Sequence, residues 1–71
     1  MNEKQYEMVF LRKVIQKQKE YRKHLRASIE TTEKEKDLKY LKATLEEVER
    51  DIKIKEMQLQ KMREEVAKCP E

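Results

Sequence analysis

The sequence predicts an all-α protein in which a long α-helix forms an oligomeric coiled coil, with an αα-hairpin that turns near residues 30–33 as the alternative. Three observations support this fold class. The 71 residues include no glycine and one proline, 46% of the side chains are charged, and apolar side chains recur every three or four residues. Sheets and phosphate-binding loops depend on turn residues that are scarce here. The chain is also too short to enclose a catalytic pocket, so we expect no enzyme.

The composition divides the chain into five expected segments. Residues 1–7 form an N-terminal flank, and residues 70–71 form a tail that begins at Pro70, which closes the helix because it has no backbone donor. Between them we expect an irregular, basic helical segment over 8–29, a polar phase break over 30–37 and a regular heptad coiled coil over 38–69.

The segment 8–29 has an apolar seam with interruptions. Its apolar positions at three- and four-residue spacing are Met8, Leu11, Ile15, Leu25 and Ile29. Phe10, Val14 and Tyr21 lie beside this seam and make the apolar stripe wider than a two-stranded coiled coil requires. Two interpretations stay open: these side chains contact a further protein partner, or they shield a dimer seam.

The same segment is strongly basic. Residues 12–26 hold seven cations and one acid, and four of the cations fall along one helical stripe beside the seam: Arg12, Lys19, Lys23 and Arg26. Such a stripe is a candidate contact for an anionic polymer, whose counterions would be released on binding. The competing interpretation is a solvated flank that pairs with acidic helices.

The polar stretch 30–37 contains no apolar side chain. Thr32 and Glu35 have the spacing of a capping box, which would start a second helix and create the hairpin. Because the stretch lacks glycine, proline and asparagine and is rich in good helix formers, we favour one continuous helix with a shift of phase. That helix would be about 100 Å long.

The segment 38–69 has the clearest pattern in the chain. Nine of its ten seam positions are apolar, and the seam consists of Leu38, Leu41, Leu45, Val48, Ile52, Lys55, Leu59, Met62, Val66 and Cys69. This spacing is typical of helices that pack against other helices. Since such side chains stabilise a helix only when a partner buries them, we expect the chain to associate with itself.

The predicted function is therefore a non-enzymatic oligomerisation or scaffolding segment of a larger intracellular protein, most simply a homodimer, with a higher oligomer as an alternative. The alternative function is a basic module that contacts a cytoskeletal filament or nucleic acid through residues 12–26. Nucleic acid is the less favoured partner because no base-reading motif is present. One cysteine forms no internal disulfide and no apolar run reaches membrane-spanning length, so we expect a cytoplasmic protein without membrane insertion.

Chemistry at single residues receives little support from the sequence. His24 and Glu20 have helical spacing, but two ligands make a poor metal site. Cys69 and His24 lie too far apart to act as a nucleophile and base. We expect no cofactor, no metal and no catalytic residue.

Overall fold

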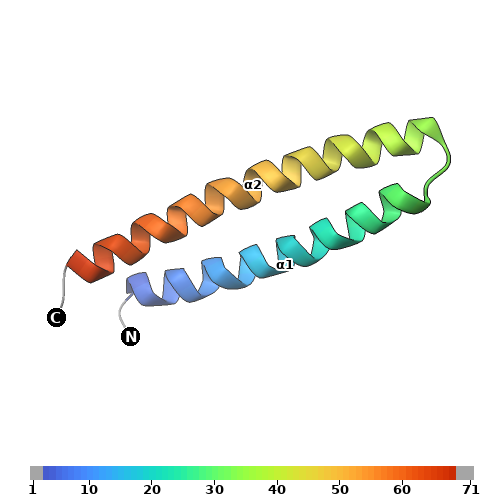
Figure 1. Ribbon diagram of the computed structural model, residues 1–71. Helices are drawn as coiled ribbons and strands as arrows, with labels where there is room; N and C mark the ends of the chain where they lie inside the picture. The colour runs from blue at the N-terminus through green and yellow to red at the C-terminus, as the bar shows by residue number, and fades with distance from the viewer. Residues whose placement is uncertain (1–2, 69–71) are drawn as a thin grey trace.

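The structure, a computed structural model, describes residues 3–68. Two helices account for nearly all of this part: α1, Glu3–Thr31, and α2, Glu35–Lys68. They run antiparallel along their whole length, so that Glu3 and Lys68 lie at one end and the connection lies at the other (Figure 1). The all-α class and the hairpin alternative are thereby confirmed, and the preference for one continuous helix was wrong.

Local sequence explains why both segments are helical. Glutamate, lysine, arginine, glutamine and leucine, which are good helix formers, make up most of both segments. Acidic side chains occupy the first turns, with Glu3 in α1 and both Glu35 and Asp37 in α2. Negative charge at this end of a helix is favourable because the backbone N–H groups there leave a partial positive charge.

The chain reverses over residues 32–34. Thr32 does not cap α2 in the way that the capping box predicts. Its hydroxyl donates to the Ser28 carbonyl at 2.6 Å and closes the end of α1 instead. The Thr31 hydroxyl bonds to the Ala27 and Ser28 carbonyls at 3.3 and 3.2 Å. The bonds to Ser28 satisfy one of the carbonyl groups that a helix end leaves without amide partners.

Helix α2 restarts immediately after the turn. The Leu38 amide donates to the Lys34 carbonyl at 2.9 Å, which makes Lys34 the residue that caps α2. No residue of the described part has a positive φ angle, so the reversal needs no glycine. This explains the wrong preference, since the lack of glycine was its main support.

The core is a narrow line of apolar side chains between the helices. Four side chains are buried in the part of the chain that the structure describes: Ile15 and Leu25 of α1, and Ile52 and Leu59 of α2. Ile52 is only 1% exposed, and burial of such a side chain contributes about 1.5–3 kcal/mol. Ile15, Ile52 and Leu59 form one cluster, and the partly buried Met8, Leu11 and Val48 pack against it.

These burial energies favour the hairpin within a single chain. Opening the helix at the turn gives up a few backbone hydrogen bonds of about 1 kcal/mol each. Burial of four side chains stabilises the hairpin by more than that loss. The partner helix is also already tethered, because it belongs to the same chain. The molecule extends 56 Å along its long axis, little more than half the length expected for a continuous helix. Neither described helix has an apolar stretch long enough to cross a membrane.

Candidate functional site

The structure places the C-terminal seam inside the hairpin. Nine seam residues between Leu38 and Val66 are buried or half-buried, and they lie on the side of α2 that faces α1. The tenth, Cys69, lies outside the described residues. Self-association through this seam stays a prediction, and it would require the hairpin to open because α1 of the same chain already covers the seam.

The N-terminal seam forms the other side of this contact. All five of its apolar residues are buried or half-buried: Met8, Leu11, Ile15, Leu25 and Ile29. Gln18, Arg22 and Thr32, the polar residues at the remaining positions of that seam, are half-buried as well. The two seams, which differ in phase along the sequence, therefore face each other across the hairpin.

A polar network interrupts the apolar contact. Asp51 Oδ2 accepts hydrogen bonds from Lys55 Nζ at 2.5 Å and from Gln18 Nε2 at 2.6 Å. The bonds from Lys55 and then Gln18 lower the pKa of Asp51 below its ordinary value of 3.8. Lys55, which the heptad pattern places in the seam, thus has a local counter-ion. The Gln18 side-chain oxygen is buried and accepts no hydrogen bond within the described part of the chain.

One flank of the hairpin is apolar and exposed. Tyr6 and Phe10 of α1 line a groove of about 430 Å³ together with Gln58 and Met62 of α2. Tyr21 follows Phe10 by eleven residues, or three helical turns, and so lies on the same flank.

Side chains of α2 extend this flank toward the turn. Ile54 lies beside Asp51 on α2. Asp51 accepts a hydrogen bond from Gln18 of α1 on this flank of the hairpin. Tyr40 precedes Ile54 by two heptads and shares its helix face. We call the five exposed side chains of this flank the aromatic face: Tyr6, Phe10, Tyr21, Tyr40 and Ile54.

The opposite flank is charged. Lys19 pairs with Glu56 at 3.6 Å and Arg26 with Glu49 at 2.9 Å, so that two of the four cations in the predicted basic stripe are bound to α2. The other two, Arg12 and Lys23, are exposed and form no ion pair within residues 3–68.

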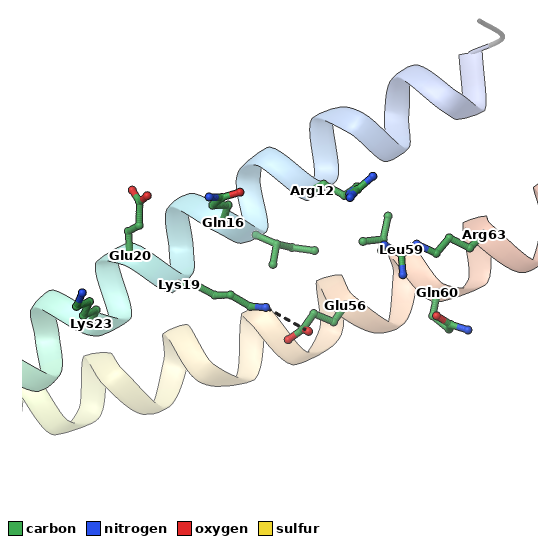
Figure 2. A pocket seen from close by; sticks show the side chains of 10 residues that line it. Arg12, Gln16, Lys19, Glu20, Lys23, Glu56, Leu59, Gln60 and Arg63 are labelled. Atoms are coloured by element: carbon green, nitrogen blue, oxygen red, sulfur yellow. Dashed lines mark ion pairs between the residues drawn. The ribbon is translucent and has the colours of Figure 1, made fainter.

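A groove of about 590 Å³ runs along this charged flank (Figure 2). Its cations are Arg12, Lys19 and Lys23 of α1 and Arg63 of α2, and buried Ile15 and Leu59 form part of its lining. We call it the basic groove. Figure 2 shows Glu20, which also lines the groove, pointing away from α2.

Metal ligands do not gather in the described part of the chain. Among residues 3–68, no three histidine, cysteine, aspartate or glutamate side chains are placed to hold one ion. His24 is exposed on α1.

Comparison of the chain with known protein families, with curated proteins and with solved structures finds no match in any of the three.

Sequence reasoning did not single out Arg63 as a binding residue or Tyr6, Tyr40 and Ile54 as part of one surface. The sequence does contain a signal for the aromatic face, since Tyr21 follows Phe10 by eleven residues and Ile54 follows Tyr40 by fourteen. Arg63 becomes part of the basic groove only when α2 folds back on α1, which a continuous helix does not allow.

Proposed function

We propose that this chain is a non-enzymatic association module: a helical hairpin whose aromatic face binds a second copy, giving a four-helix homodimer. The observation that supports the proposal is the exposure of large apolar side chains on one flank after the seams have paired. Phe10 is 70% exposed and Tyr40 is 72% exposed. The predicted self-association is thus assigned to a different surface from the seam, which the hairpin uses internally.

The exposed area is of the size that a dimer requires. Aromatic side chains bury about 150–250 Å² each, so the exposed fractions of the five residues amount to roughly 600 Å² of mostly apolar surface per copy. A standard interface buries about 800 Å² on each partner, including its polar rim. Exposed apolar side chains that gather on one flank are characteristic of interaction surfaces.

The small core supports the same proposal. Only four side chains are buried within residues 3–68, whereas a domain of this size needs a larger core or an oligomeric partner for ordinary stability. A second hairpin on the aromatic face would double the number of helices that share the core. The single cysteine, which can form no internal disulfide, supports a cytoplasmic setting for such a dimer.

Sedimentation equilibrium tests the proposal with a matched pair of variants. We expect the wild-type chain to dimerise and Phe10→Glu to remain a monomer, because the substitution places a charge at the centre of an apolar contact. Val9→Glu is the control. It adds the same charge one residue away, on the flank of Arg12, which lies three residues further along the helix.

Circular dichroism establishes that both variants are helical. A wild-type monomer at about 100 μM, where even a complex with a Kd of about 10 μM would form, overturns the proposal. Equal weakening by Val9→Glu would show that the association does not use the aromatic face.

A further inference from the structure

A regular ladder of charges crosses the basic flank. Lys19 pairs with Glu56. Seven residues further along α1, Arg26 pairs with Glu49, which lies seven residues before Glu56 on α2. Both rungs are ion pairs. The same step in the other direction places Arg12 opposite Arg63, and the two arginines line one groove. The third rung therefore brings two positive charges together.

This rung is a candidate anion site. Figure 2 shows Arg12 on α1 and Arg63 on α2 at the same end of the basic groove, with Leu59 between them. Lys23 lines the groove near its other end, eleven residues or about 16 Å along α1. None of these three cations forms an ion pair with another described residue, whereas Lys19 is paired with Glu56.

We propose that the basic groove binds a chain of phosphate groups, held at one end by Arg12 and Arg63 and at the other by Lys23. Guanidinium groups match phosphate oxygens with paired hydrogen bonds, and an anion between two arginines removes their mutual repulsion. A phosphate chain is flexible enough to contact both ends of the groove. Contacts of this kind need no base-reading motif, because only the backbone charges are bound.

The lining of the groove favours phosphate over an acidic protein. A partner helix would need apolar side chains to bury, but Ile15 and Leu59 in the groove are already covered within the hairpin, at 6% and 8% exposure. Five of the seven large apolar side chains that are exposed in the described part lie on the opposite flank, in the aromatic face. The groove can therefore bind a partner through its charge but not through exposed apolar surface. The inference does not depend on dimerisation, since it uses the other flank.

The test measures binding of the full chain to two phosphate polymers in separate arms: a fluorescently labelled oligothymidylate and inorganic polyphosphate that displaces it. Arg12→Gln/Arg63→Gln removes the like-charge rung. The control, Arg50→Gln/Lys61→Gln, removes the same charge from exposed residues that do not line the groove. The groove variant should fold at least as well as wild type, because it relieves a repulsion.

Salt dependence gives the expected size of the effect. Three phosphate contacts on a single strand predict a slope of about −2 in log K against log salt, so raising salt from about 50 to 200 mM weakens wild-type binding roughly twentyfold. The groove variant keeps one phosphate contact, so the same increase in salt should weaken its binding only about threefold. The control variant should show the salt dependence of wild type.

Binding in either arm with these slopes supports the site and identifies the source of the phosphates. The proposal is overturned if neither polymer binds at low salt, or if the control variant weakens binding as much as the groove variant does. Tighter binding of polyglutamate than of both phosphate polymers would also overturn it.

Discussion

Asp51 is the residue at which charge, burial and helix pairing meet. Its carboxylate lies between Gln18 of α1 and Lys55 of α2 and accepts a hydrogen bond from each. Lys55 occupies a seam position, where an unpaired ammonium group would be costly to cover. Asp51, four residues before Lys55 on the same helix, supplies the counter-charge and joins α1 through Gln18.

The lowered pKa of Asp51 has a consequence for stability in acid. Folding favours the ionised carboxylate, so its contribution to the free energy of unfolding is complete above the unfolded-state pKa, near 3.8, and is lost as the pH falls through the lower folded-state pKa. We expect Asp51→Asn to flatten the decline in stability between about pH 6 and about pH 3.

Urea denaturation followed by circular dichroism across this range measures the effect. Glu47→Gln removes the same charge from an exposed residue of α2 without an ion pair in the described part, and it should leave the decline unchanged. Parallel curves for the two variants would contradict a special role for Asp51.

At the scale of elements, the turn over residues 32–34 decides the architecture. Threonine hydroxyls close α1, and Lys34 begins α2 with its carbonyl as the first acceptor. A lysine side chain at this position has no acceptor for the free amides of the first turn, and its charge opposes the helix dipole. The start of α2 is therefore the weakest local feature of the hairpin.

A better capping residue at position 34 should stabilise the protein. We expect the free energy of unfolding of Lys34→Ser to be about 1 kcal/mol higher than that of Lys34→Ala. Both substitutions remove the charge, but only serine can accept a hydrogen bond from a backbone amide. In a chain of this size, that difference raises the Tm by about 4–8 °C, which thermal denaturation can measure. Serine and alanine variants that melt together would show that residue 34 does not cap α2.

At the scale of the whole molecule, the hairpin is a short, thick rod with two different flanks. The aromatic face lies on one flank and the basic groove on the other. The hydrogen bond between Gln18 and Asp51 lies on the side of the aromatic face. The ion pairs Lys19–Glu56 and Arg26–Glu49 lie on the other side of the buried seam, with the basic groove. Under the two proposals, a second copy would bind one flank and a phosphate chain the other.

Small-angle X-ray scattering tests this shape. A hairpin has a long dimension near 56 Å and a Cα radius of gyration of 16.3 Å as a monomer. Side-by-side dimerisation thickens the particle without lengthening it. A maximum dimension near 100 Å, the length of an unbroken helix, in a particle of monomeric mass would contradict the hairpin.

Much of the local structure could be predicted, because helix propensity and apolar spacing act over a few residues. The described residues of both seams, from Met8 to Val66, are all buried or half-buried, although a few residues outside the seams, such as Val14 and Asp51, are half-buried as well. The basic stripe was only half recognisable as a site. Arg12, Lys19 and Arg26 follow one another at seven-residue spacing, yet only Lys19 and Arg26 have an acid opposite them on α2, and that depends on how the helices are aligned.

Helix propensity and apolar spacing establish that this chain is helical and that each helix has one face to cover. A seven-residue apolar repeat is the same whether the covering helix belongs to the same chain or to another, so it carries no information about the partner. The pairing of α2 with α1 becomes evident from the folded chain. The physical reason is that three residues without a positive φ angle suffice to reverse the chain, and a tethered helix buries the seam.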